Sequence, residues 1–176
     1  MRAVVATAVL GALLTAAALS DVRVRRVSNR LNATVLVAGL LLARPWPPAF
    51  ASLGDSLGGV VVGLMIWLPM YLLRLIGAGD VKLLAASGAW LGLAGTVSAS
   101  IATALAGGLL GLVWIVARQG AGAAMMAVTH AFRVPSLLQL RPLDRRERVP
   151  YAVAIAVGVS MVWLRSVGLF VLHPRG

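Results

Sequence analysis

Long apolar runs alternate with short clusters of charged residues along the chain. Uncharged runs occupy residues 3–20, 31–43, 56–73, 83–117 and 149–164, and the last continues beyond Arg165 to Leu172. Most of them approach or exceed the roughly 20 residues that a helix needs to cross about 30 Å of hydrocarbon, while residues 31–43 form a shorter run. The pattern predicts an all-α, polytopic integral membrane protein.

One of these runs is too long for a single pass. As one helix, the 35 residues at 83–117 would extend about 52 Å at 1.5 Å per residue, far beyond the hydrocarbon thickness even with tilt. We expect the chain to fold back near Gly92-Leu93-Ala94-Gly95, which gives about six transmembrane helices. Glycines spaced at i, i+4 predict close helix packing in three pairs: Gly59 and Gly63, Gly88 and Gly92, and Gly107 and Gly111.

The basic residues favour an even number of passes. With six passes and the N-terminus outside, twelve of the 16 Lys and Arg residues face inward, in accord with the positive-inside rule. With five passes, the basic block at residues 118–148 would lie outside. Residues 3–20 also resemble a cleaved signal peptide, but cleavage would leave the basic residues at 23–30 outside. We therefore expect the first helix to be retained in a single membrane-embedded domain, residues 1–176.

The composition agrees with a membrane location and narrows the chemistry. The chain is 60% hydrophobic and 12% charged, with a mean hydropathy of +0.94, whereas soluble domains are about 45–50% apolar and about 25% charged. A net charge of +11 beside apolar spans predicts contact with anionic lipid. The sequence contains no basic patch interleaved with aromatic residues, so we expect no nucleic-acid partner. The absence of cysteine excludes disulfides, thiolate metal sites and cysteine nucleophiles.

The polar stretch at residues 118–150 has too little core for a domain. Met125, Val128 or Thr129, and Phe132 repeat at helical spacing, which predicts a short helix on the inner membrane surface. His130 within this stretch is interpreted as a surface residue.

Only five residues are acidic, and three of them have ordinary explanations. Asp144 and Glu147 lie among arginines, as in a solvated charge cluster. Asp55 follows Gly54 and precedes Ser56, which indicates a turn residue or a helix N-cap.

The other two, Asp21 and Asp80, are candidate catalytic residues. Asp21 ends the first span and Asp80 opens the fourth, so the six-pass topology places them at the same inner depth although they are 59 residues apart. Each alone could be an interfacial cap paired with arginine. Together, two carboxylates sharing one proton can hydrolyse an amide, because one takes a proton from water while the other protonates the scissile group. This chemistry needs no metal and no cofactor.

The residues around Asp80 fit such a site. Gly77 and Gly79 allow backbone conformations and close approach that a side chain would block. Lys82 either biases the protonation of the two aspartates or extends to the lipid surface, and the sequence does not separate these roles.

Three ordered segments resemble the type IV prepilin peptidases, membrane aspartic proteases with a Gly-x-Gly-Asp motif. The segment at residues 77–83, Gly-Ala-Gly-Asp-Val-Lys-Leu, matches the second-aspartate motif. Residues 21–31 resemble the first-aspartate motif, with Asn29 in its hydrophobe-Pro-Asn turn and Ser28 in place of the usual proline. Residues 149–158 resemble the start of the last helix of that family.

The resemblance implies a function. It implies removal of the short basic leader from prepilins at the cytoplasmic face of the bacterial inner membrane, with Asp21 and Asp80 as the catalytic pair and Gly77, Gly79, Lys82 and Asn29 in support. Pilus assembly machinery is an implied partner. Larger members carry cysteine pairs associated with N-methylation, so this chain resembles the compact, peptidase-only members that serve Flp or Tad-type pili.

Two other interpretations remain open. A presenilin-type intramembrane protease shares the Gly-x-Gly-Asp motif, but its aspartates lie deeper in long spans. A non-enzymatic assembly subunit, or a transporter that uses the aspartates as a proton relay, would be expected to carry acidic residues in mid-span.

Overall fold

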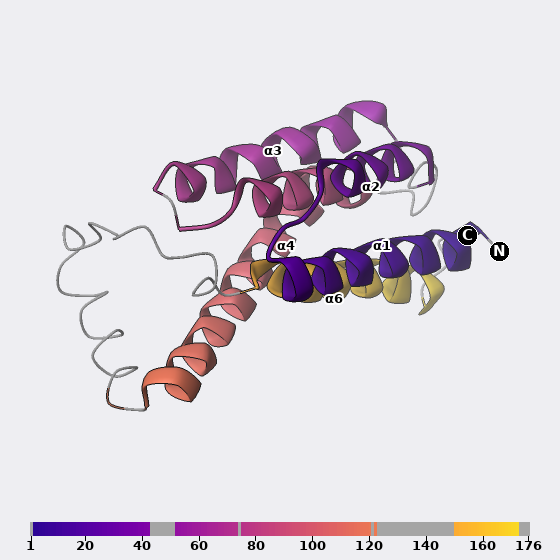
Figure 1. Cartoon of the computed structure of the whole chain (residues 1–176). Coiled ribbons are helices and arrows are strands. Elements are labelled where there is room, and N and C mark those ends of the chain that lie inside the picture. The colour runs from indigo at the N-terminus through magenta and orange to yellow at the C-terminus, as the bar shows by residue number, and fades with distance from the viewer. Residues whose placement is uncertain (1, 43–51, 74, 121, 123–149, 173–176) are drawn as a thin grey trace.

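The computed structural model describes residues 2–42, 52–73, 75–120, 122 and 150–172, most of which are helical. The predicted surface helix near residues 125–132 and the charge cluster at 141–148 lie outside these residues. The helices, shown in Figure 1, are α1 (Arg2–Val24), α2 (Asn29–Leu42), α3 (Leu53–Leu72), α4 (Ala78–Gln119) and α6 (Tyr151–Leu172).

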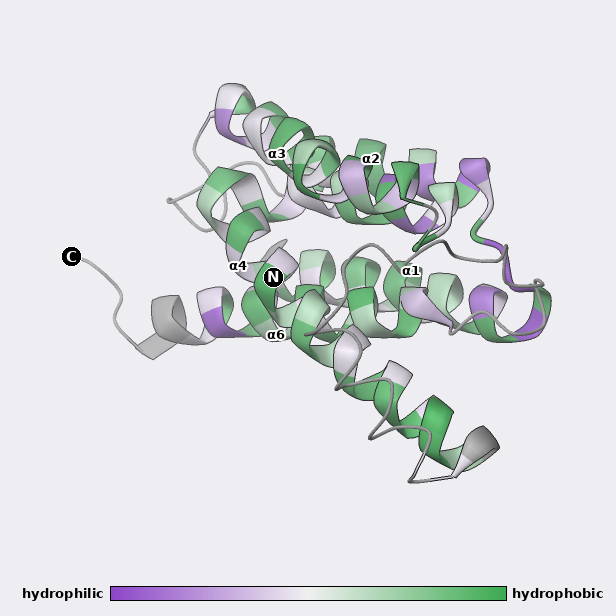
Figure 2. Cartoon of the chain, turned by 90° about the vertical axis from the view of Figure 1, so that its left-hand side faces the viewer, coloured by the Kyte–Doolittle hydropathy of each residue, from purple (hydrophilic) through white to green (hydrophobic). Residues whose placement is uncertain are grey.

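The helices have the length and surface of membrane spans. Four of the described helices, α1, α3, α4 and α6, are long and apolar enough to cross a bilayer, while α2 is apolar but has 14 residues. Large apolar side chains such as Val61, Leu105 and Met161 are exposed on the outside of the bundle. Figure 2 shows hydrophobic colour over most of the helices. The chain is therefore a helical, multi-pass membrane protein, as predicted; the count of six spans stays a prediction.

The break predicted in the longest apolar run is confirmed. Gly92 interrupts α4 with φ 66° and ψ −176°, a left-handed conformation that glycine adopts without a steric penalty. A Cβ on Gly63 of α3 would lie 3.0 Å from Cα of Ala85 and 3.2 Å from Cγ2 of Thr96. In one straight helix Ala85 and Thr96 would be about 16 Å apart, so the second half of α4 folds back.

The side chain of Asp55 secures this break, which corrects the sequence interpretation of that residue. Ser52, not Asp55, is the N-cap of α3, because its hydroxyl accepts the Asp55 backbone N–H at 2.9 Å. The Asp55 carboxylate accepts the backbone N–H of Leu93 at 3.2 Å. The fold-back at Gly92 exposes that N–H, so Asp55 caps the helix that begins there, 38 residues further along the chain.

Helices α1 and α6 pack antiparallel along matching buried stripes. The buried residues of α1 recur every three or four positions as Ala6, Leu10, Leu14, Ala17 and Asp21, and those of α6 include Ala152, Ile155, Val159 and Trp163. At one end, the indole N–H of Trp163 donates to the Thr7 hydroxyl at 3.0 Å. Asp21 thus occupies the last position of an otherwise apolar stripe, which explains its burial.

Glycines bring the backbones of α3 and α4 into contact. This confirms the close packing predicted for two of the three glycine pairs, Gly59 with Gly63 and Gly88 with Gly92. A Cβ on Gly59 would collide with the backbone of Gly88 and Gly92. In the third pair, Gly107 faces the Tyr151 ring, but a Cβ on Gly111 would meet nothing within 4 Å among the described residues, so these residues contradict the predicted packing role of Gly111.

Trp90 fills the centre of the bundle. Its indole N–H donates to the Val35 carbonyl of α2 at 2.8 Å, and its ring meets Trp163 edge-on with centroids 5.8 Å apart.

Candidate functional site

Three helix ends line a cavity of about 660 Å³ at one end of the bundle. They are the end of α1 and the starts of α2 and α4, and the start of α6 adjoins the end of α1 (Figure 1). The cavity is lined by residues 20–21, 24–29, 77–80 and 82. The two sequence segments that carry the candidate aspartates therefore form one site.

Asp21 lies in the last turn of α1 and is 7% exposed. Its Oδ2 atom accepts the backbone N–H of Ala152 at 3.1 Å. Ala152 is in the first turn of α6, where backbone N–H groups have no partner within the helix. The carboxylate thus caps α6 and also faces the cavity. A cap paired with arginine is the structural alternative predicted from the sequence; the structure shows a cap on the N-terminus of α6 together with an electrostatic attraction to Arg25.

The chain turns sharply just after Asp21. Arg25, one turn further on, has φ 55°, and its N–H donates to the Asp21 carbonyl at 2.9 Å. Its guanidinium lies 5.1 Å from the centroid of the Trp114 ring, which brings the second half of α4 to the same end of the molecule. The Ser20 hydroxyl donates to the Arg26 carbonyl at 2.8 Å and closes the turn.

Asp80 is in the first turn of α4, which begins at Ala78. Its Oδ2 atom accepts the backbone N–H of the N-cap residue Gly77 at 3.3 Å, which is one half of a capping box, because glycine has no side chain to return the bond. Gly77 has φ −80° and ψ 149°, which any residue adopts. A Cβ there would lie 3.0 Å from the Asp80 carboxylate. Gly77 therefore provides room for the carboxylate rather than an unusual backbone conformation, and the conformational part of the prediction is wrong.

Gly79 lets the two motif segments touch. A Cβ on Gly79 would lie 3.1 Å from the carbonyl oxygen of Val27 and 3.3 Å from its Cβ. The close approach predicted for this glycine is confirmed.

Two side-chain hydrogen bonds tie α2 to the start of α4. The ammonium group of Lys82 donates to Oδ1 of Asn29 at 3.1 Å. The amide of Asn32 donates to the Gly79 carbonyl at 3.0 Å. Asn32 was missed by sequence reasoning, although it is a polar residue in an apolar helix and lies almost one turn beyond Asn29.

The start of α6 lies near both carboxylates. Asp21 holds Ala152, and Asp80 lies within electrostatic range of the neighbouring Tyr151 phenol. The Tyr151 ring also packs against Trp67 of α3, with centroids 5.6 Å apart. The site thus offers two carboxylates at the wall of a polar cavity, an arrangement able to polarise a peptide carbonyl and activate water.

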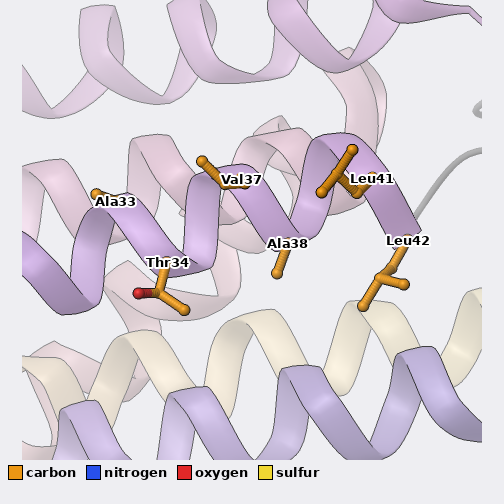
Figure 3. Close-up of a pocket in the computed structure, with 6 residues that line it drawn as sticks. All are labelled: Ala33, Thr34, Val37, Ala38, Leu41 and Leu42. Atoms are coloured by element: carbon orange, nitrogen blue, oxygen red, sulfur yellow. The ribbon is translucent and has the colours of Figure 1, made fainter.

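A second hollow, of about 500 Å³, lies along α2 and contains no comparable chemistry. Figure 3 shows its lining, in which Thr34, Ala38 and Leu42 point to one side of the helix and Val37 points to the other. The one hydroxyl in this lining, on Thr34, already donates to the Arg30 carbonyl at 2.9 Å.

Comparison with known protein families finds a match over most of the chain. The model of the "Type IV leader peptidase family" matches residues 8–115, which include both aspartates. No solved structure matches the chain.

The chain is also similar to curated proteins named "Prepilin leader peptidase/N-methyltransferase". The protein from Xanthomonas campestris pv. campestris is 34% identical over 117 residues, 62% of this chain and 40% of that protein. The one from Burkholderia pseudomallei strain 1026b is 37% identical over 100 residues, which are 53% of this chain and 32% of that protein. The one from Pectobacterium carotovorum subsp. carotovorum is 33% identical over 101 residues, which are 53% of this chain and 36% of that protein. The aligned part therefore spans well under half the length of each relative.

Proposed function

Because the chain belongs to the type IV leader peptidase family, we propose that it is a membrane endopeptidase that removes the basic leader from type IV prepilins. The relatives described above are named for a leader peptidase activity. The observation that supports the proposal most is the shared cavity, whose wall contains both Asp21 and Asp80.

In the proposed reaction, Asp21 and Asp80 share one proton. The ionised carboxylate takes a proton from a water molecule, whose oxygen attacks the scissile carbonyl carbon. The protonated carboxyl donates its proton toward the scissile group, the C–N bond breaks, and the products are a leader carboxylate and a new amino terminus. Gly77 and Gly79 leave space for Asp80 and for the contact with Val27, while Lys82 and Asn29 hold the two motif segments together.

We propose that the site faces the cytoplasm at the bacterial inner membrane. Arg23, Arg25, Arg26, Arg30 and Lys82 all belong to the end of the bundle that carries the cavity. Such a concentration of positive charge is typical of the cytoplasmic side of a membrane protein.

The proposed substrates are prepilins of the Flp or Tad type, and the proposed product is unmethylated. The sequence resemblance to the compact members supports the substrate class. The lack of cysteine in this chain supports a peptidase without methyltransferase activity.

Coexpression with a candidate prepilin tests this function. The prepilin is expressed with and without the peptidase, and its mass is measured after membrane extraction. We expect the mass to fall by that of the leader only when the peptidase is present. An unchanged mass with every Flp and Tad prepilin of the same genome would contradict the proposal. A prepilin with the residue before the scissile bond replaced by proline is the control.

A further inference from the structure

A third space, a groove more apolar than the candidate site, lies next to that site. It has a volume of about 310 Å³ and lies between α2, α3 and the first half of α4. It is lined by Asn29, Asn32, Ala33, Leu36, Val60, Leu64, Lys82, Ala85 and Ala86. Asn29 and Lys82 line both this groove and the cavity that contains the aspartates, so the two spaces adjoin at this hydrogen-bonded pair.

One buried polar atom in this groove lacks a partner. Asn32 is 5% exposed, and its amide nitrogen donates to the Gly79 carbonyl. Within the described part of the chain, its Oδ1 atom accepts no hydrogen bond. A buried acceptor left unpaired costs roughly 1–3 kcal/mol. The groove is therefore suited to a ligand that combines an apolar body with an N–H donor.

The walls of the groove favour a peptide. The small residues Ala33, Ala85 and Ala86 permit close approach of another backbone, as small residues do between transmembrane helices. Helices α2 and α3 touch each other only sparsely, so a segment can enter from the lipid side. A lipid acyl chain would fill the apolar part but has no N–H to offer Asn32.

We propose that this groove binds the apolar segment of the substrate that follows the cleaved bond, with Oδ1 of Asn32 accepting a backbone N–H of that segment. The inference rests on the proposed peptidase function. A substrate whose scissile bond lies between Asp21 and Asp80 extends its polar leader into the open cavity and its apolar part into the groove. Because Asn32 also holds Gly79, occupation of the groove is linked to the residue next to Asp80.

Filling the groove tests this assignment. Ala33→Phe places a ring in the groove, and Thr34→Phe is the matched control. Both residues are exposed on α2, but Thr34 lines only the 500 Å³ hollow along α2 and not the groove. We expect Ala33→Phe to raise KM for full-length prepilin at least tenfold with little change in kcat, and Thr34→Phe to stay within twofold of the wild type. Both variants should cleave a short peptide that lacks the apolar segment at the wild-type rate. An equal KM for both variants with full-length prepilin overturns the proposal.

A cross-linking measurement separates failure of this inference from failure of the proposed function. The chain has no cysteine, so Leu64→Cys introduces the only thiol, in the groove, and Thr34→Cys introduces it outside. We expect prepilins with a single cysteine in the apolar segment to form a disulfide with Leu64→Cys and not with Thr34→Cys, whether or not cleavage occurs. Cleavage without this disulfide overturns the groove and leaves the peptidase. A disulfide without cleavage supports the groove and contradicts the peptidase.

Discussion

Three aspartates among the described residues each accept a hydrogen bond from a backbone N–H. Substitutions at these three positions can therefore separate a capping role from a catalytic role. Asp21 accepts the N–H of Ala152, Asp80 that of Gly77, and Asp55 that of Leu93. Asparagine keeps an oxygen acceptor of similar geometry but cannot act as a carboxylate acid or base. An aspartate that serves only as a cap should therefore tolerate asparagine.

Asp55 provides the residue-scale prediction. Removal of its side chain in Asp55→Ala leaves the Leu93 N–H without its acceptor at the break in α4. We expect the free energy of unfolding to fall by about 0.5–2 kcal/mol, the range measured for lost helix caps. Asp55→Asn should lose much less. Reversible unfolding in mixed detergent micelles measures both values, and equal losses in the two variants would show that the hydrogen bond is not the cause.

At the scale of helices, the apolar runs predicted most elements because lipid requires long uninterrupted apolar segments. The length of residues 83–117 also located the break, which occurs at Gly92. Helix ends were less well predicted. The first span was expected to end at Asp21, but the helix continues to Val24 and places Asp21 inside its last turn. An aspartate can remain inside a helix at a buried position when an N–H group donates to it, and the donor, Ala152, lies 131 residues away.

The same limit explains what sequence reasoning missed at the site. The motifs identified Asp21, Asp80 and the flanking glycines, because residue type and local spacing are visible in the chain. The partner of Asp55, the contact of Lys82 with Asn29 and the role of Asn32 depend on which helices become neighbours. Those contacts follow from packing between distant segments, which local periodicity does not encode.

Two glycines in different helix contacts give the element-scale prediction. Gly79→Ala would push its new methyl group against Val27, next to Asp80, whereas Gly63→Ala would push against Ala85 in the packing between α3 and α4. Both should lose stability, by about 1–3 kcal/mol for overpacking. We expect Gly79→Ala to lose at least tenfold in leader cleavage per folded molecule and Gly63→Ala to lose less than threefold. Cleavage rates normalised to the folded fraction decide between them, and equal normalised rates would reduce Gly79 to a packing role.

For the molecule as a whole, hydrophilic residues gather at helix ends and hydrophobic residues cover the sides of the bundle (Figure 2), so we expect the helices to cross the membrane along their length. We expect six passes with the N-terminus outside. Reporter fusions after Arg30 and within residues 118–148 should report the cytoplasm, and a fusion within residues 44–51 should report the outside. A periplasmic signal at either of the first two positions would contradict the predicted topology.

The product of the reaction gives a second prediction at this scale. We expect purified protein to cleave prepilin without added S-adenosylmethionine and in the presence of a metal chelator, and to leave an unmethylated amino terminus. Mass spectrometry of the processed pilin distinguishes the outcomes. A product heavier by one methyl group, formed only with this protein and added S-adenosylmethionine, would contradict the peptidase-only proposal. Loss of cleavage with the chelator would contradict a mechanism that needs only two aspartates.

The central claim is that Asp21 and Asp80 act together on one peptide bond. The most direct measurement is single-turnover cleavage of prepilin by Asp21→Asn, Asp80→Asn and Asp55→Asn, each checked for folding in the same membranes. Asp55 is the matched control, because it is also a capping aspartate but lies near Leu93, about 20 Å along α4 from Asp80. We predict that Asp21→Asn and Asp80→Asn each lower the rate at least a thousandfold while remaining folded, and that Asp55→Asn stays within threefold of the wild type. Cleavage within tenfold of the wild type by either Asp21→Asn or Asp80→Asn would contradict the claim.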